Sequence, residues 1–200
     1  MTRSVEFYFD VGSPASWLAW TQLPALAERY GAELVYKPVL LGGIFKATGN
    51  NTRAALPPKG RYLFRDLARF ARRYGVPFTF PPGFPANTLT LMRILTGVQM
   101  HRPDDFGACV DVLFRMLWQY GINPEDETTL RDTLGGAGLD ADALLALAGQ
   151  EDVKQALKEA TNEAVERGLF GLPTMFVDGE MFWGQDRLDF VREQLESSDA

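Results

Sequence analysis

The sequence predicts an α/β protein in which two sheet-forming blocks flank a long helical segment. Residues 1–42 have the pattern of strand, helix, strand, and residues 168–200 that of two strands and a helix. Residues 43–167 contain mainly helical patterns, separated by loops rich in Gly and Pro. Because an isolated pair of strands is unstable, the strands of the first block should pair with those of the last. We therefore expect one sheet-containing domain, 1–42 with 168–200, interrupted by a helical insertion domain at 43–167.

The first block begins with a predicted strand at Val5–Phe9, which is short, aromatic and β-branched. Ser13 at an N-cap position, with a proline directly after it, predicts the start of a helix. Apolar residues at helical spacing extend this helix over 14–30, with a kink at Pro24. Glu33–Lys37 follows as a second strand, parallel to the first through a right-handed crossover. The block is therefore a βαβ unit.

The middle block begins at 41–58 with a segment rich in Gly, Asn, Thr and Pro, which is predicted to be mostly loop. Helical spacing of apolar residues then predicts five helices, at 60–74, 88–100, 106–120, 141–147 and 151–167. In the first of these helices, arginines occupy the polar face, as is typical of a helix side exposed to solvent. The block is long enough for an insertion with its own core.

The last block starts with a predicted β-hairpin. Two apolar runs, Thr174–Val177 and Met181–Trp183, flank Asp178-Gly179, a dipeptide typical of tight hairpin turns. A final helix opens at 184–187 and continues to Leu195 through apolar residues at helical spacing. This block therefore supplies two strands and a helix to the predicted sheet domain.

Composition limits the kind of function. The chain has 200 residues, 20 Lys and Arg against 26 Asp and Glu, and a formal net charge of −6. A negative balance argues against nucleic acid as a partner, because such binding depends on contacts with phosphates. A single Cys excludes an internal disulfide and a Cys-based metal cluster, and a single His argues against a His-rich metal site. We expect no metal, so any catalysis must use hydroxyls, carboxylates, lysines or a bound cofactor.

The sequence contains no pattern typical of a membrane span or a targeting segment. No apolar run approaches the roughly 20 residues that cross a bilayer. Residues 1–4 lead directly into the apolar run Val5–Asp10, which is too short and too acidic for a signal-peptide core. We expect a soluble, cytoplasmic protein that does not act at a membrane.

Two short segments are candidates for a functional site. The first, 10–16, places Ser13 where a strand ends and a helix begins, a position at which backbone N–H groups converge and negative charge is favoured. The second, 171–174, places Pro173 at the head of a strand, where a cis peptide bond is tolerated. Each segment also has a simpler interpretation without a functional role. In that interpretation Ser13 is a helix cap and nothing more, and Pro173 is the first residue of a strand. The sequence alone does not show that the two segments meet.

The order of elements, with a polar residue at the start of the first helix, resembles the thioredoxin-like fold of the disulfide oxidoreductase superfamily. Redox members of that superfamily carry Cys-x-x-Cys at this position, whereas this chain carries Ser13-Pro14-Ala15-Ser16. Disulfide exchange is therefore the least expected activity, because a serine alkoxide is inaccessible near neutral pH without a base.

Further segments extend the resemblance along nearly the whole chain. They are Phe7-Tyr8-Phe9-Asp10, the run GGIFKATGN at 42–50, Phe170-Gly171-Leu172-Pro173-Thr174, and Phe182-Trp183-Gly184-Gln185-Asp186-Arg187. Together with Ser13 they are similar to 2-hydroxychromene-2-carboxylate isomerases and kappa-class glutathione transferases. The resemblance implies that glutathione is the cofactor, that the substrate is a small aromatic carboxylate, and that the chain forms a homodimer.

The resemblance also implies roles for individual residues. Ser13 would donate its hydroxyl to the glutathione thiolate, and the helix start would lower a thiol pKa that is ordinarily near 8.5. Leu172, before a cis proline, would pair with the cysteinyl backbone of glutathione as an added strand, and Asn50 would be a further contact. Four successive residues at the start of the last helix complete the predicted glutathione site: Gly184, Gln185, Asp186 and Arg187. From its position alone, Asp186 would be interpreted as a simple first-turn acid on the helix dipole, and only the match of the whole string favours the ligand role.

Candidates for binding the organic substrate lie in the insertion. A carboxylate-bearing aromatic molecule needs a cation and apolar walls, and Lys46 and the region of Asn87 are assigned to it. The family pattern of an Asn–Arg pair and a Tyr has no clean match here, where Arg53 and Phe84 stand nearby. Arg53 is interpreted as a solvated loop residue, so the identity of the substrate stays open.

Two remaining residues are interpreted as structural. Cys109 belongs to an apolar helical pattern and is predicted to be a buried, inert thiol. His101 stands at a predicted helix end, where it should meet the last carbonyl groups.

Three hypotheses about function follow. The first is a glutathione-dependent cis–trans isomerase acting on 2-hydroxychromene-2-carboxylate or a similar aromatic carboxylate. The second is a kappa-like transferase, in which the same thiolate stays attached to an electrophile. The third is a non-catalytic thioredoxin-like module that binds peptides or a partner along its sheet edge. Consumption of glutathione separates the first two, and a lack of affinity for glutathione would support the third.

Overall fold

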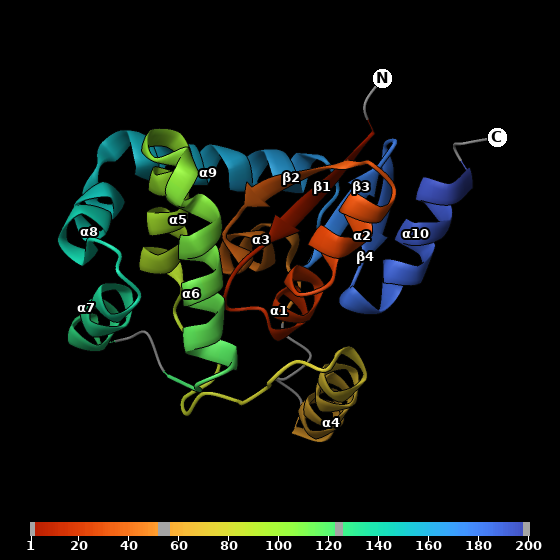
Figure 1. Ribbon diagram of the computed structural model, residues 1–200, viewed down its shortest axis with the longest axis horizontal. Coiled ribbons are helices and arrows are strands. Elements are labelled where there is room, and N and C mark those ends of the chain that lie inside the picture. The colour runs from red at the N-terminus through yellow and green to blue at the C-terminus, as the bar shows by residue number, and fades with distance from the viewer. Residues whose placement is uncertain (1–2, 52–56, 123–125, 198–200) are drawn as a thin grey trace.

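The computed structural model describes residues 3–51, 57–122 and 126–197 and contains a four-stranded sheet (Figure 1). The strand order is β2-β1-β3-β4. Its strands are β1 (Ser4–Phe9), β2 (Glu33–Pro38), β3 (Thr174–Val177) and β4 (Glu180–Trp183). β1 pairs in parallel with β2 and antiparallel with β3, with Phe7 opposite Tyr36 on one side and Met175 on the other. The expected pairing between the first and last blocks is therefore confirmed.

The crossover between β1 and β2 contains two helices, α1 (Pro14–Trp20) and α2 (Leu23–Arg29), instead of the single kinked helix predicted. Pro24 lies in the first turn of α2, where a missing N–H group costs nothing. In a continuous helix its ring would clash with the carbonyl of Trp20, so the first helix ends at that residue and a new one begins.

The insertion consists of helices in the part of the chain that the structure describes. They are α3 (Leu41–Thr48), α4 (Pro57–Tyr74), α5 (Leu89–His101), η2 (Pro103–Asp105), α6 (Phe106–Trp118), α7 (Glu127–Gly136), α8 (Ala141–Gly149) and α9 (Glu151–Glu166). Arg53 lies outside the described residues.

Two of these helices correct the sequence interpretation. The segment predicted as loop forms α3 despite two glycines, because the backbone N–H of Leu41 is accepted by the Asp10 side chain and Ile44 is buried. No helix was predicted at α7. It begins with Asp126 as a side-chain cap and buries Leu130 and Leu134. In both cases, contacts distant in sequence or a local cap outweigh weak helix propensity.

The main hydrophobic core extends from the sheet into the insertion. Phe9 of β1 and Trp17 of α1 pack against Phe114 of α6, with ring centroids 5.8 and 5.9 Å apart. Trp118, at the end of α6, donates its indole N–H to the Val11 carbonyl at 2.7 Å. The insertion therefore packs directly behind the turn that follows β1. The proposed division into two domains remains a prediction.

A second, smaller cluster covers the opposite face of the sheet. It contains Tyr8 and Phe176 from the strands and Ile44 and Ala164 from the helices α3 and α9. Figure 1 shows α9 and α3 lying along this side of the strands. After β4 the chain forms a short turn of helix, η3 (Gln185–Arg187), and then α10 (Leu188–Ser197). Over the described ranges, no helix is both long and apolar enough to cross a membrane.

Candidate active site

Ser13 lies in the turn between β1 and α1, and only 4% of its surface is exposed. Its hydroxyl oxygen accepts a hydrogen bond from the backbone N–H of Ser16 at 3.2 Å, which caps α1. The same hydroxyl donates to the carbonyl oxygen of Leu172, also at 3.2 Å. Ser13 is thus a helix cap and, in addition, the contact through which the two candidate segments meet.

The segment around Leu172 is fixed from several sides. The Leu172–Pro173 peptide bond is cis. The Pro173 carbonyl accepts the backbone N–H of Gly184 at 2.9 Å, and the Phe170 ring packs on Trp183 with centroids 4.7 Å apart. A Cβ atom at Gly171 would lie 2.7 Å from the Trp183 indole nitrogen, so this position requires glycine. These contacts bring the start of η3 beside the turn that carries Ser13.

The backbone amides near Ser13 are used inside the protein. The Ser13 N–H donates to the Asp10 carbonyl at 3.0 Å, and the Gly12 N–H donates to the Asp10 carboxylate at 2.8 Å. Pro14 has no N–H to offer. The hydroxyl of Ser13 is therefore a better candidate than these amides as a donor to a ligand.

Asp10 is a part of this region that the sequence interpretation missed. Its side chain is 1% exposed and accepts hydrogen bonds from Gly12 N, Leu41 N and Thr88 Oγ1. Burial raises the pKa of its carboxyl, while the three donors act in the opposite direction. The one signal in the sequence was an Asp two residues before a Gly at a strand end, which is typical of any Asx turn.

Asn50 lies just after α3 and reaches the other segment. Gly49, in a left-handed conformation, ends the helix, and the Asn50 side-chain amide then donates to the Phe170 carbonyl at 2.7 Å. Lys46 lies one turn earlier on α3 and is exposed. The structure therefore places Asn50 beside the Leu172 segment and Lys46 on the helix that carries it.

Asn87 lies directly before the residue that precedes α5. Its side-chain oxygen accepts the Leu89 backbone N–H at 3.1 Å, and the residue is exposed. The next residue, Thr88, donates to the buried Asp10 carboxylate at 3.1 Å. The local hydrogen bond supports the start of α5, so the described contacts of Asn87 are those of a helix-starting residue.

The three residues of η3 have different environments. Gln185 is 4% exposed, and its side-chain oxygen accepts the Tyr74 hydroxyl at 2.9 Å, which ties α4 to this turn. Asp186 and Arg187 form an ion pair at 2.9 Å with both side chains about half exposed. Gly184 has a φ of 108°, and a Cβ there would lie 2.5 Å from Asp186 Oδ1, so glycine is required. Gly184 thus shapes the turn, while Asp186 and Arg187 remain open to solvent.

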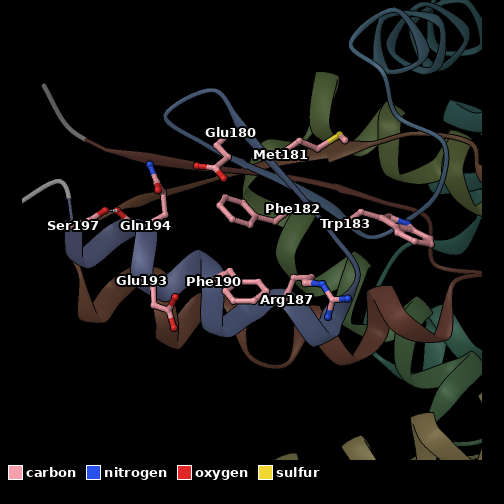
Figure 2. Close-up of a pocket in the computed structure, with 9 residues that line it drawn as sticks. All are labelled: Glu180, Met181, Phe182, Trp183, Arg187, Phe190, Glu193, Gln194 and Ser197. Carbon is pink, nitrogen blue, oxygen red and sulfur yellow. Dashed lines mark hydrogen bonds between the residues drawn. The ribbon is translucent and has the colours of Figure 1, made fainter.

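A groove of about 570 Å³ runs between β4 and α10 at the outer edge of the sheet (Figure 2). Phe182 from the strand and Phe190 from the helix lie in the space between these elements. The groove is lined by Arg187 and by Trp183, whose ring packs on Phe170 near Leu172, but Ser13 does not line it. The groove is therefore a neighbour of the candidate site and not its centre.

Among the residues that the structure describes, other reactive side chains form no second centre. The described ranges contain no group of three or more His, Cys, Asp or Glu residues that could hold a metal ion. Cys109 is buried, and burial raises its thiol pKa to about 12, which makes it unreactive near neutral pH. His101 Nε2 lies 3.1 Å from the Asp152 carboxylate, a contact that the sequence interpretation did not include.

Comparison with known sequences places the chain among characterised proteins. The DsbA-like thioredoxin domain family matches residues 4–196. A 2-hydroxychromene-2-carboxylate isomerase of Sphingobium xenophagum is 37% identical over 197 residues, which cover 98% of this chain and 99% of that protein. Glutathione S-transferase kappa 1 of Rattus norvegicus is 33% identical over 204 residues, with coverage of 94% and 89%.

Solved structures agree with these relationships. A 2-hydroxychromene-2-carboxylate isomerase structure superposes with a TM-score of 0.85 at 32% identity, covering 97% of this chain and 95% of the other. A probable DsbA oxidoreductase from Streptomyces coelicolor has a TM-score of 0.73 at 19% identity, over 98% and 89% of the two chains, which shows the fold alone. The similarities over the full length show that the chain belongs to the DsbA-like thioredoxin family and, within it, is an enzyme of the 2-hydroxychromene-2-carboxylate isomerase family, to which kappa-class glutathione S-transferases are related.

Proposed function

We propose that the protein is a glutathione-dependent cis–trans isomerase acting on 2-hydroxychromene-2-carboxylate or a similar aromatic carboxylate. The glutathione thiolate adds to a conjugated double bond of the ring-opened substrate, forming a carbon–sulfur bond and moving an electron pair onto the conjugated carbonyl group. Rotation then occurs about the resulting single bond. Return of the electron pair expels the thiolate, so glutathione is regenerated and no redox change occurs.

The contact between Ser13 and the Leu172 carbonyl supports this proposal best. It joins the helix start to the backbone that would pair with the cysteinyl part of glutathione. In that pairing the cysteinyl N–H would donate to the Leu172 carbonyl in place of the Ser13 hydroxyl. The Ser13 hydroxyl would then be free to donate a hydrogen bond to the sulfur. A hydroxyl donor of this kind would lower the thiol pKa by about one unit, or ~1.4 kcal/mol.

The remaining candidate residues receive roles consistent with their positions. Asn50 would hold the Phe170–Leu172 backbone and contact the peptide. Gly184 and Gln185 would shape and anchor the turn, while Asp186 and Arg187 would bind the ammonium and carboxylate of the γ-glutamyl end. Lys46 and Asn87 would face the substrate carboxylate. We also propose a cytoplasmic homodimer, which the family resemblance supports.

A kappa-like transferase is the second candidate, and the 33% identity to glutathione S-transferase kappa 1 favours it. Both reactions need the same activated sulfur. Incubation with glutathione and the chromene carboxylate separates them: an isomer formed without loss of glutathione supports the isomerase. A stable adduct with a halogenated aromatic compound, and no isomer, supports the transferase.

The role of Ser13 is tested by Ser13→Ala, with Ser16→Ala as the matched control. Ser13 caps α1 and contacts Leu172, whereas the buried Ser16 hydroxyl oxygen has no hydrogen-bond partner in the described part of the chain. Ser13→Ala should raise the pKa of bound glutathione by about one unit, measured by thiolate absorbance, and slow isomerisation. Ser16→Ala should change neither.

Loss of a helix cap also costs about 1 kcal/mol of stability, so the unfolding free energy of each variant is measured in parallel. An unchanged thiol titration in folded Ser13→Ala would contradict the assigned role. A structure with glutathione bound away from Ser13 would contradict the site itself.

A further inference from the structure

Burial of the Asp10 carboxylate is energetically unfavourable unless neighbouring groups donate hydrogen bonds to it. Within residues 3–51, 57–122 and 126–197 it is the only Asp or Glu that is buried. Asp10 lies three residues before Ser13. The groups that donate hydrogen bonds to Asp10 therefore show which segments it connects to the Ser13 turn.

The three donors to Asp10 come from three segments that are far apart in the sequence. Gly12 N lies 2.8 Å from Oδ1, while Leu41 N and Thr88 Oγ1 lie 2.9 and 3.1 Å from Oδ2. Gly12 belongs to the turn before Ser13, Leu41 begins α3, and Thr88 precedes α5. One side chain therefore joins the Ser13 turn to two helices of the insertion.

The contact with Leu41 extends this link to the far side of the site. The side chain of Leu40, the N-cap residue of α3, makes no capping hydrogen bond. Asp10 instead supplies an acceptor for the first turn from outside the helix. α3 has eight residues, a rigid rod of about 12 Å, and Asn50 follows its end. Asn50 in turn holds the Phe170 carbonyl. Asp10 thus links the position of Asn50, through α3, to the Ser13 turn.

We propose that Asp10 is a positioning residue that fixes the Ser13 turn and, through α3, Asn50, so that both meet a single glutathione molecule. This inference rests on the proposed function, because it assigns to Asp10 the geometry of that thiol site. Asp10 itself touches neither glutathione nor substrate. Its effect is carried by the Gly12 and Leu41 amides.

Asp10→Asn tests the inference, with Thr161→Val as the matched control. Asparagine keeps the shape but offers one acceptor oxygen, and its NH₂ group faces N–H donors. Thr161 accepts the backbone N–H of Leu40 at 3.0 Å, beside the amide held by Asp10, so its variant loses a comparable bond at the same helix start. The Ser13 turn is untouched in that control.

Asp10→Asn should weaken glutathione binding about fivefold or more by calorimetry and raise the pKa of the bound thiol. Simple loss of a nearby negative charge would lower that pKa, so the sign separates positioning from direct electrostatics. Thr161→Val should leave the bound thiol pKa at its wild-type value. Circular dichroism and thermal melting confirm that each variant is folded.

A bound thiol pKa in Asp10→Asn that is equal to or below wild type would overturn the inference, and so would an equal rise in Thr161→Val. If wild-type protein does not bind glutathione at all, the proposed function fails first. Should Asp10→Asn not fold, Thr88→Val removes one donor and leaves the carboxylate. It should weaken binding about twofold with a raised thiol pKa, and wild-type values would overturn the inference.

Discussion

A serine in place of the first redox cysteine determines what the Ser13 turn can do. A thiol there would form disulfides, whereas the Ser13 hydroxyl keeps its proton at neutral pH and can only donate it in a hydrogen bond. The one cysteine of the chain, Cys109, is buried with a thiol pKa of about 12. The protein therefore has no accessible thiol of its own, and a thiolate chemistry needs a thiol supplied by a ligand.

Asn50→Ala should weaken glutathione binding more than it slows turnover. The variant loses the hydrogen bond to the Phe170 carbonyl, which supports the backbone next to Leu172. Because Asn50 is exposed, stability should change by no more than about 0.5 kcal/mol. Steady-state kinetics should show a KM for glutathione raised several-fold with kcat nearly unchanged. A loss confined to kcat would argue against this role.

The sequence singled out Ser13, Leu172 and Asn50 as candidates because ordered motifs along the chain resemble a known family. It did not identify Asp10, although this residue stands in one of those motifs. The importance of Asp10 comes from burial and from donors supplied by Leu41 and Thr88, which are distant in sequence. Such partners become visible only when the chain is folded.

At the scale of helices and strands, the predicted and observed structures also differ where contacts distant in sequence decide the outcome. Two glycines and the polar end of α3 favour a loop locally, but Asp10 and Thr161 accept the N–H groups of its first turn. The β-hairpin was predicted correctly, because its turn chemistry is local to Asp178-Gly179. A turn determined by neighbouring residues can be predicted from the sequence. A helix such as α3, which is stabilised by residues distant in the sequence, cannot.

A second contact between elements joins β1 to the end of α9. Arg167 forms an ion pair with Glu6, with nitrogen–oxygen distances of 2.6 and 3.0 Å, and lies 4.1 Å above the Phe176 ring. The hydrogen bond from Arg167 lowers the pKa of the Glu6 carboxyl, although burial opposes this. Burial, above all, raises the pKa of the neighbouring Tyr8 to about 12. The cluster fixes the chain where the insertion returns to the sheet.

Glu6→Gln should therefore destabilise the protein in a pH-dependent way. A carboxyl whose pKa is lowered on folding stabilises the protein above its unfolded pKa of about 4.3 and loses this contribution as the pH falls through the folded value. Chemical denaturation at pH 7 should show a loss of about 1–2 kcal/mol relative to wild type. The difference should shrink below about pH 4. A loss that is the same at both pH values would indicate a packing effect only.

At the scale of the whole molecule, the sheet and the insertion share one apolar cluster. It includes Phe7 and Phe9 of β1 together with residues of α5, α6, α8 and α9. A shared core of this kind favours unfolding of both parts in one step. The proposed boundaries at 42–43 and 167–168 would then describe the order of the elements along the chain, and the two parts would not unfold independently.

Equilibrium unfolding tests this expectation. Tryptophan fluorescence, which includes Trp17 of the sheet side and Trp118 of the insertion, should change at the same denaturant concentration as far-ultraviolet circular dichroism, which is dominated by helices. Coincident curves indicate a single cooperative unit. Two separated transitions would show that the insertion unfolds independently.

The indole of Trp118 bound to the Val11 carbonyl has a consequence for protein engineering. The residue at the end of α6 supports the backbone two positions before Ser13, so the helical insertion and the Ser13 turn are not interchangeable parts. A chimera that transplanted these helices onto another thioredoxin scaffold would have to carry a hydrogen-bond donor at position 118, together with a loop that receives it. Under the proposed function, the insertion that would bind the substrate and the turn that would activate the thiol are coupled through this one hydrogen bond.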